Sequence, residues 1–364
     1  MNKLGFGFLR LPKANDEIDY DELNQMVDTF LAGGRTYFDT AYTYLNGKSE
    51  EAIRKALVQR HPRESFQLAT KAPGYHAKSY EDCQKFFEES CRRCGVEYFD
   101  VYMLHWLNRK NYAIAEQYDQ FRFLRELKAS GKAKRIGFSF HDTAELLDEI
   151  LTAHPEVDCV LMQINYLDWE SEGVQSRKCY ETALRHGKSI LVMEPVKGGT
   201  LASVPEEAQA VLDQIDPTLT PSAHALRFAQ SLPGVETVLS GMGTLTQVQE
   251  NIKPISPATD ADCALLQQAA TILKKSIAVA CTGCGYCEKH CPKQIAIPDY
   301  FKLYNEYARN PGDNWKITPA YDAITLTRGK ASDCIGCGLC EQNCPQKLPI
   351  REHLRAVKAA MEGE

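Results

Sequence analysis

The sequence predicts an α/β protein, a closed (β/α)8 (TIM) barrel followed by a small cysteine-rich domain. Between residues 35 and 245, short apolar runs alternate with longer amphipathic stretches. The repeat is about 30 residues long, the length of a strand and its returning helix. The apolar runs are almost continuous, as in parallel strands that are buried on both faces. After residue 276 this rhythm stops, and cysteine and proline become frequent.

Seven apolar runs are expected to be strands. They are residues 35–44, 65–73, 99–107, 134–141, 159–167, 189–199 and 235–243. A closed (β/α)8 barrel has eight strands, so one further strand of few residues is expected in addition to these seven. LGFGFLRLP, which precedes the first run, is interpreted as a hairpin that caps the bottom of the barrel.

Helical periodicity fills the intervals between these runs. Residues 79–94 are expected to form the helix after the second run, and residues 244–256 and 259–275 the helices that close the barrel. An open, doubly wound sheet is the alternative fold, but no G-x-G-x-x-G opens a helix after the first run. The predicted domains are therefore a barrel over residues 1–275 and a second domain over residues 276–364.

Composition excludes several classes of partner. The chain has a net charge of -6, with 44% hydrophobic and 25% charged residues. A charge of this sign gives no reason to expect nucleic acid or an anionic membrane. MNKLGFGFLRLPK lacks the apolar core of a signal peptide, and no run is apolar for the roughly 18 residues of a membrane span, so a cytoplasmic protein is expected.

Fourteen cysteines in a reducing compartment favour metal ligands or redox groups over disulfides. Eight of them lie in two runs, CTGCGYCEKHC and CIGCGLCEQNC, each followed by proline. The other six are expected to be small buried apolar groups, including the C-x-x-C inside the predicted helix 79–94. These six are Cys83, Cys91, Cys94, Cys159, Cys179 and Cys263.

Ionisable residues end three successive apolar runs. The first run gives Asp39 and then Tyr44, the second Lys71 and the third His105. In a barrel these strand ends converge on one opening, where catalysis takes place. A lysine cation beside a tyrosine favours the phenolate and makes the phenol a better acid. Asp39 would hold Lys71, and His105 would hydrogen-bond a carbonyl oxygen beside Tyr44.

Each of these residues also has an alternative interpretation. Lys71 could be a surface lysine, His105 a hydrogen-bonded histidine in the core, and Asp39 a helix N-cap. Their joint position in three consecutive repeats favours catalysis. No side chain donates a hydride, so a cofactor is required to reduce a carbonyl carbon.

Several motifs resemble the aldo-keto reductase family over residues 4 to about 275. They are FDTAYTYLNGKSE, ATKAP, YMLHW, IGFSFH, QINYL and GMGTLTQVQEN. The resemblance implies Asp39, Tyr44, Lys71 and His105 as the catalytic tetrad. It also implies NADPH bound across the barrel mouth and reduction of aldehydes and ketones. The residues implied to bind the nucleotide are Ser139 and Gln163 for the nicotinamide carboxamide, and Glu250 and Asn251 for the adenine.

The chain departs from the family pattern at three positions. Phe140 follows Ser139 where asparagine is common, Met193 stands where an aromatic ring usually stacks on the nicotinamide, and Gln247 replaces an arginine for the 2'-phosphate. An amide cannot make the bidentate charged contact of arginine, so NAD and NADP both remain open as cofactor. Lys197, before two glycines, is a candidate for the pyrophosphate, with a solvated lysine as the alternative.

Both cysteine runs have the spacing C-x2-C-x2-C-x3-C-P, which resembles bacterial ferredoxins with two [4Fe-4S] clusters. A structural zinc site has two C-x-x-C pairs separated by a longer loop, so zinc is the weaker alternative. The resemblance implies a crossed arrangement in which the last cysteine of each run serves the other cluster. Cys281, Cys284, Cys287 and Cys344 would hold one cluster, and Cys334, Cys337, Cys340 and Cys291 the other.

The stretch between the runs, residues 292–333, is longer than in compact ferredoxins and is expected to pack this domain against the barrel. The clusters could be redox carriers or structural staples of a domain with little core. The expected function is a NAD(P)-dependent oxidoreductase of a small carbonyl or alcohol, linked to a redox protein partner.

Two other arrangements remain open. A flavin could mediate between nicotinamide and clusters, although no flavin motif is visible. Alternatively, the barrel could be a docking platform in an electron-transfer adapter.

Overall fold

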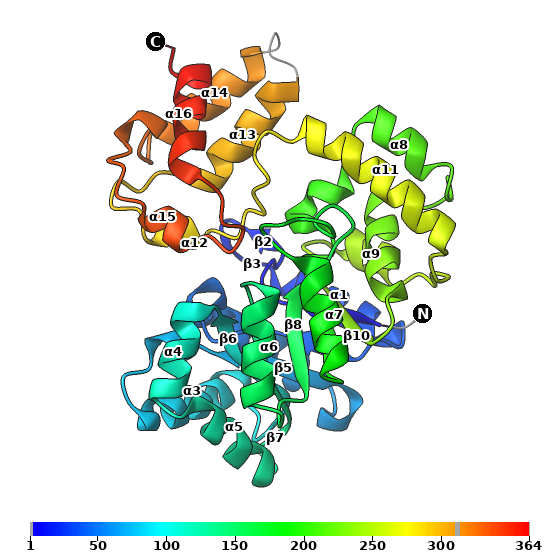
Figure 1. Ribbon diagram of the computed structural model, residues 1–364, viewed down its shortest axis with the longest axis vertical. Helices are drawn as coiled ribbons and strands as arrows, with labels where there is room; N and C mark the ends of the chain where they lie inside the picture. Colours follow the sequence, from blue (N-terminus) through cyan, green and yellow to red (C-terminus); the bar gives the residue numbers. More distant parts are fainter. Residues whose placement is uncertain (1–2, 310–313, 364) are drawn as a thin grey trace. The chain divides into compact units, whose positions relative to one another are not determined.

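The computed structural model describes residues 3–309 and 314–363 of the chain. It contains two compact units (Figure 1). One consists of Met1–Pro195 and Ala223–Thr259, and the other of Val196–Ser222 and Asp260–Glu364. The predicted boundary at residue 275 coincides with the end of a helix, Asp260–Ser276, and stays a prediction.

Eight parallel strands of the first unit form a closed barrel, which confirms the predicted fold class. Their order around the barrel is β1-β10-β9-β8-β7-β6-β5-β4. The strands are β1 (Leu4–Gly7), β4 (Tyr37–Asp39), β5 (Gln67–Ala72), β6 (Phe99–Leu107), β7 (Ala133–Phe140), β8 (Cys159–Gln163), β9 (Ser189–Met193) and β10 (Val235–Ser240).

The missing strand is β1, so the interpretation of LGFGFLRLP as a hairpin was wrong. β1 pairs in parallel with both β10 and β4, with Leu4 opposite Val238 and Gly5 opposite Tyr37. A side chain on Gly5 would begin 2.7 Å from the Leu239 side chain, so glycine relieves crowding in a strand here. The short antiparallel pair follows later, as β2 (Lys13–Ala14) and β3 (Glu17–Ile18).

The barrel interior is a packed core. β4, β5, β6, β8, β9 and β10 contribute buried side chains to one cluster, as expected for a barrel whose interior is filled by side chains. This interior cluster consists of Tyr37, Ala69, Val101, Met103, Cys159, Leu161, Leu191 and Leu239. Because these side chains fill the barrel, polar groups for catalysis must come from the strand ends.

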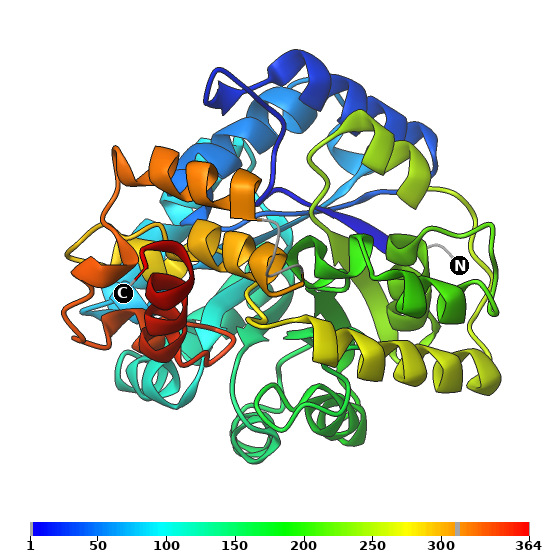
Figure 2. The ribbon, with the colours of Figure 1, turned by 90° about the horizontal axis from the view of Figure 1, so that it is seen from above.

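Helices surround the strands of the first unit (Figures 1 and 2). They are α1 (Tyr20–Ala32), α2 (Lys48–Ile53), α3 (Tyr80–Cys94), α4 (Arg109–Gln117), α5 (Gln120–Ala129), α6 (Ala144–Ala153), α7 (Ser176–Arg185), most of α9 (Pro221–Ser231) and α10 (Leu245–Asn251). α3 confirms the predicted helix and contains Cys91 and Cys94. It ends at Gly95, whose φ of +73° suits a residue without a side chain.

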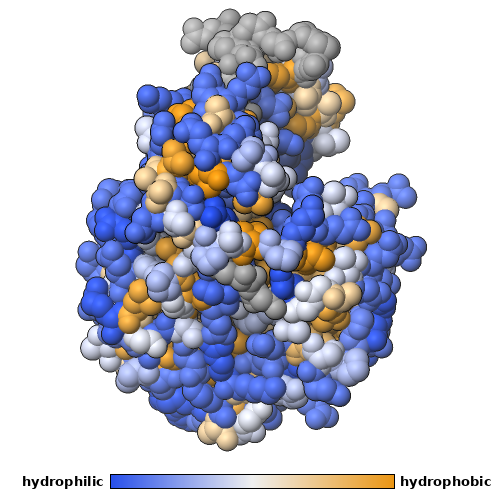
Figure 3. Space-filling model, turned by 90° about the vertical axis from the view of Figure 1, so that its right-hand side faces the viewer, coloured by the Kyte–Doolittle hydropathy of each residue, from blue (hydrophilic) through white to orange (hydrophobic). Residues whose placement is uncertain are grey.

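The six scattered cysteines are buried to different degrees. Cys83, Cys94, Cys159 and Cys179 are buried, as predicted, whereas Cys91 and Cys263 are only partly buried. On the face shown in Figure 3, hydrophilic residues predominate and hydrophobic ones form small groups. Within the described residues, no helix is both long and apolar enough to cross a membrane.

The second unit is helical. Its helices are α8 (Glu206–Leu212), α11 (Asp260–Ser276), α12 (Tyr286–Lys289), α13 (Ile297–Arg309), α14 (Asn314–Thr325), α15 (Leu339–Gln342) and α16 (Ile350–Met361). α13, α14 and α16 lie side by side (Figures 1 and 2). Residues 310–313, inside the long stretch between the cysteine runs, lie outside the described residues.

The stretch between the cysteine runs builds a core for the second unit. α13 supplies Tyr300 and Phe301, α14 supplies Tyr321, and all three are almost completely buried. They pack with residues of α16 such as Leu354. The domain therefore has an apolar core of its own. This core makes a purely structural role of the clusters less necessary.

Candidate active site and cluster-binding residues

Three neighbouring strands bring the predicted tetrad together. Asp39 ends β4, Lys71 lies in β5, His105 lies in β6, and Tyr44 begins the turn that follows β4. The Lys71 ammonium donates to Asp39 Oδ1 at 2.5 Å and to the carbonyl oxygen of Thr40 at 2.7 Å. Its Nζ lies 4.9 Å from the centroid of the Tyr44 ring. The ring centroids of Tyr44 and His105 are 5.7 Å apart.

The Lys71–Asp39 ion pair is buried. Lys71 is 0% exposed and Asp39 is 2% exposed, so Lys71 is not a surface lysine, and Asp39 serves an ion pair and not a helix cap. Burial lowers the pKa of Lys71, which the charge of Asp39 partly offsets. Burial also raises the pKa of Asp39, against the effect of Lys71. Each group therefore depends on the other to stay charged.

His105 is a buried histidine whose Nδ1 lacks a hydrogen bond within the described residues. It is 4% exposed. Burial, followed by the charge of Lys71, holds the pKa of His105 well below its usual range. The imidazole is therefore neutral at physiological pH. A neutral imidazole carries one N–H, which is the donor that a carbonyl oxygen requires.

Glu50 supports the ion pair and was missed from the sequence. It lies in α2, is fully buried, and accepts from Thr70 Oγ1 at 2.8 Å. Arg93 lies 3.4 Å from its other oxygen. Burial raises the pKa of Glu50, and its charge in turn favours the charged form of Lys71. Its only signal in the sequence was its place in GKSEE, six residues after Tyr44.

The two residues expected at the nicotinamide end neighbouring strands. Ser139 lies in β7 and is 1% exposed, and its Oγ accepts the backbone N–H of Trp106 at 2.7 Å. Trp106 has a φ of +62°, an unusual value for a large side chain that marks a strained backbone beside His105. Phe140 is buried opposite Leu107 and so offers no polar group in place of asparagine.

Gln163, at the end of β8, is oriented by a small polar network. Its Nε2 donates to Asp168 Oδ2 at 2.7 Å, and Asn165 donates to the same oxygen at 3.0 Å. Asn165 also donates to the carbonyl oxygen of Glu194 at 3.0 Å. Sequence patterns did not single out Asp168 or Asn165, although both lie within QINYLD.

The residues expected at the adenine lie in α10, just after β10. Asn251 donates to Ser240 Oγ at 3.2 Å, Gln247 accepts the N–H of Gly243 at 2.7 Å, and Glu250 is partly exposed. This hydrogen bond fixes the Gln247 side chain against the loop that precedes α10. Met193 ends β9 and packs against the interior cluster of the barrel.

Lys197 is not grouped with the other expected nucleotide residues, because it belongs to the second unit. It is 1% exposed, and its Nζ lies 3.3 Å from Gln346 Oε1. The alternative of a solvated lysine is therefore wrong. Its contact with the pyrophosphate stays a prediction.

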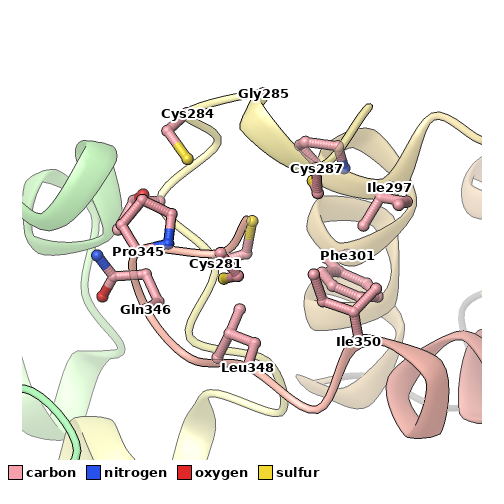
Figure 4. Close-up of a pocket in the computed structure, with 13 residues that line it drawn as sticks. Cys281, Cys284, Gly285, Cys287, Ile297, Phe301, Pro345, Gln346, Leu348 and Ile350 are labelled. Atoms are coloured by element: carbon pink, nitrogen blue, oxygen red, sulfur yellow. The ribbon is translucent and has the colours of Figure 1, made fainter. Parts of the chain in front are cut away.

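The eight cysteines of the two runs line two hollows of the second unit. Cys281, Cys284, Cys287 and Cys344 line the first hollow (Figure 4), and Cys291, Cys334, Cys337 and Cys340 line the second. These are the crossed sets expected from the ferredoxin spacing. The space inside the hollows is similar, about 310 and 320 Å³.

The loops around the two hollows have matching conformations. Gly283 and Gly285 have φ values of +65° and +75°, and Gly336 and Gly338 have +72° and +75°. The Gly283 N–H donates to Cys281 Sγ at 3.4 Å, as expected for loops whose amides surround cluster sulfurs. Across the described part of the chain, no three Cys, His, Asp or Glu side chains could hold a single metal ion. A four-iron cluster makes a different demand, since each cysteine binds a different iron atom.

Comparison with known proteins agrees with this geometry. The family model of aldo/keto reductases matches residues 3–270. The chain belongs to the aldo/keto reductase family. A 4Fe-4S dicluster domain matches residues 280–348. The chain is thus a barrel of the aldo/keto reductase family followed by an iron-sulfur domain of the ferredoxin type.

Curated relatives of this aldo/keto reductase are distant. A "Probable aldo-keto reductase 1" of Glycine max is 31% identical over 178 residues, which cover 46% of this chain and 49% of the relative. The chain thus spans about half the length of that protein. The "NADH-specific methylglyoxal reductase" of Escherichia coli (strain K12) is 26% identical, with 68% of this chain and 88% of the relative covered.

Solved structures share the barrel fold. An aldo-keto reductase from Bacillus halodurans, in its holo form, is 24% identical and has a TM-score of 0.61, covering 73% of this chain and 91% of that one. An aldo-keto reductase from Klebsiella pneumoniae in complex with NADPH is 18% identical, with a TM-score of 0.59, and covers 73% of this chain and 90% of that one.

Proposed function

We propose that this aldo/keto reductase interconverts a small carbonyl compound and its alcohol with NADH or NADPH. We further propose that two [4Fe-4S] clusters link it to a redox protein partner. The buried Lys71–Asp39 pair beside Tyr44 and His105 carries the proposal. A buried ion pair without a task is often no better for stability than apolar residues, which favours a chemical role.

In this proposal Tyr44 is the general acid and base. Lys71 stabilises the phenolate that forms when Tyr44 gives its proton to the carbonyl oxygen. Asp39 holds Lys71 in place, and Glu50 helps to keep it charged. In the reverse direction Tyr44 accepts the proton of the alcohol. The nicotinamide, when bound, supplies or accepts the hydride at the carbon atom.

His105 orients the substrate. As a neutral imidazole it donates to the carbonyl oxygen and so places this oxygen beside the Tyr44 hydroxyl. Tyr75, whose ring centroid lies 6.2 Å from that of His105 and 5.6 Å from that of Trp106, forms an aromatic wall beside it. Such a wall suits a small substrate with an exposed carbonyl group.

Ser139 and Gln163 are proposed to hold the nicotinamide carboxamide, and Glu250 and Asn251 the adenine. Ser139 and Gln163 fit this role because both are fixed by hydrogen bonds at the ends of adjacent strands. Neutral Gln247 leaves the 2'-phosphate without a charged partner at this position, so both nucleotides are proposed as cofactors. One relative is named for NADH and one solved structure contains NADPH.

The two cysteine-lined hollows are proposed to hold the clusters. Each supplies four thiols, and both have the glycine-rich loops that a cluster requires. When bound, the clusters carry single electrons, whereas a nicotinamide carries two. Free thiols and clusters both persist best in a reducing compartment, so we propose a cytoplasmic location.

The test uses protein purified without oxygen. Oxidation of NADH or NADPH in the presence of methylglyoxal is expected, and Tyr44→Phe should abolish it while nucleotide binding remains. If the protein binds neither nucleotide and contains no tightly bound flavin, the proposed enzymatic activity is refuted and the electron-transfer adapter is favoured. About eight iron atoms per chain are expected for two clusters. One zinc atom and no iron would overturn the cluster proposal.

A further inference from the structure

The segment after β9 contacts the loops of the first cysteine-lined hollow. Lys197 Nζ lies 3.3 Å from Gln346 Oε1, and Gln346 lines this hollow together with Cys344 (Figure 4). Lys197 is 1% exposed. Its charge is thus held away from water next to residues that are proposed to surround a cluster.

Gly198 contacts the same hollow from its other loop. A side chain on Gly198 would begin 2.2 Å from the carbonyl oxygen of Thr282, a residue between Cys281 and Cys284. The obstacle is backbone, which cannot move aside as a flexible side chain can. Thr282 itself is 3% exposed. Gly198 therefore allows an approach to the cysteine loop that no other residue would permit.

Within the described residues, no such cover is seen over the second hollow. Ile335 stands where Thr282 stands in the first run, and it is 61% exposed. Two cations line the second hollow, Lys293 and Arg351, and Lys293 is exposed. The Arg351 side chain is 44% exposed and pairs with Glu341 at 2.8 Å. Water weakens the field of both cations at the second hollow, and the Glu341 carboxylate further weakens that of Arg351.

We propose that Lys197 and Gly198 are part of the site of the first cluster, and that the Lys197 ammonium gives this cluster a higher reduction potential than the second. The inference rests on the proposed cluster ligands. Reduction adds one negative charge to a cluster, and a buried cation nearby stabilises that charge more than an exposed one. In this proposal Gly198 allows the loop of Cys281 and Cys284 to pack closely, and the Lys197 charge raises the reduction potential of the first cluster.

The order of potentials gives the two clusters different tasks. Electrons that enter the domain settle first on the cluster of Cys281, Cys284, Cys287 and Cys344. The second cluster, whose proposed ligand Cys337 is exposed, exchanges electrons with the partner. Lys197 then has a role at a cluster in place of the predicted contact with pyrophosphate.

Redox titration of the full-length holoprotein, followed by electron paramagnetic resonance, tests the role of Lys197. In Lys197→Met, one of the two potentials should fall by about 59 mV, a tenfold change in the reduction equilibrium, while the other stays constant. Lys197→Gln keeps a polar group beside Gln346 and should give the same shift. Arg351→Met, the matched control, should shift neither potential by a comparable amount.

Unchanged potentials in both neutral variants with full iron content would overturn the tuning role. Wild-type protein without iron would instead refute the cluster assignment itself, so the two failures are distinguishable. For Gly198, Gly198→Ala should lose about half of the iron. Gly199→Ala is the matched control, since Gly199 also has a positive φ of +101° but has open space around it. Equal iron content in the two alanine variants would overturn the role of Gly198.

Discussion

Replacing Lys71 with methionine removes the ammonium that lies 4.9 Å from the centroid of the Tyr44 ring. Two unit charges at this separation interact by about 3 kcal/mol at an effective dielectric constant of about 20. In the proposed mechanism, the lost interaction destabilises the phenolate that forms as Tyr44 gives up its proton. If most of this energy appears in the transition state, kcat falls on the order of 10²-fold.

The assay follows oxidation of NADH and NADPH with methylglyoxal as substrate, without oxygen. Nucleotide binding, measured by fluorescence, should change little, because Lys71 is not among the residues proposed to hold the nucleotide. Lys85→Met is the matched control. The Lys85 side chain is 71% exposed and pairs with Asp82 on the surface of α3, so kcat should stay at the wild-type value.

A loss of folding must be separated from a loss of catalysis. Lys71→Met leaves the carboxyl group of Asp39 buried without its partner, which typically costs about 3–5 kcal/mol of stability. Asp39→Asn/Lys71→Met removes the unpaired charge and should fold better while keeping the low kcat. A kcat within threefold of wild type in either variant would refute the proposed role of Lys71.

Three further predictions concern other parts of the chain. The pKa of His105 is depressed in the folded state, so its stabilising effect is present above about pH 6.5 and is lost as the pH falls. Between pH 7.5 and 5.5, the Tm of wild type should therefore fall more than that of His105→Gln, and parallel falls in differential scanning fluorimetry would contradict this. Cys287→Ser should lower the iron content by about half, whereas Cys94→Ser, in a helix of the barrel unit, should retain all of it. Glu50→Gln should lower kcat by less than tenfold and also lower Tm, and the exposed Glu51→Gln should do neither.

Seven barrel strands could be predicted because strands buried on both faces are almost wholly apolar and recur at a fixed interval. β1 does not show this signal. It has only four residues, and two of them, Gly5 and Gly7, suggest a turn when read locally. Gly5 is small because the side chains of Leu239 and Thr237 fill the space beside it, and both lie on a strand more than 200 residues away.

The proximity of Asp39, Tyr44, Lys71 and His105 could be predicted because they lie near the ends of three neighbouring strands or just after one. Their catalytic role stays a prediction. The supporting residues carry no such pattern. Glu50 is held by contacts with Thr70 and Arg93. Lys197 contacts Gln346, which lies 149 residues later in the chain. Contacts between distant segments determine these roles, and one sequence does not show which segments meet.

The pairing of β1 with β10 has a consequence for biosynthesis. Leu4 is translated more than 200 residues before its partner Val238. At about 5–20 residues per second, β1 waits for some ten seconds or longer with one edge unpaired. Cys281 to Cys344 are translated later still. Iron insertion can therefore be complete only after all eight barrel strands have been made, so newly made chains should first accumulate as a closed, iron-free barrel.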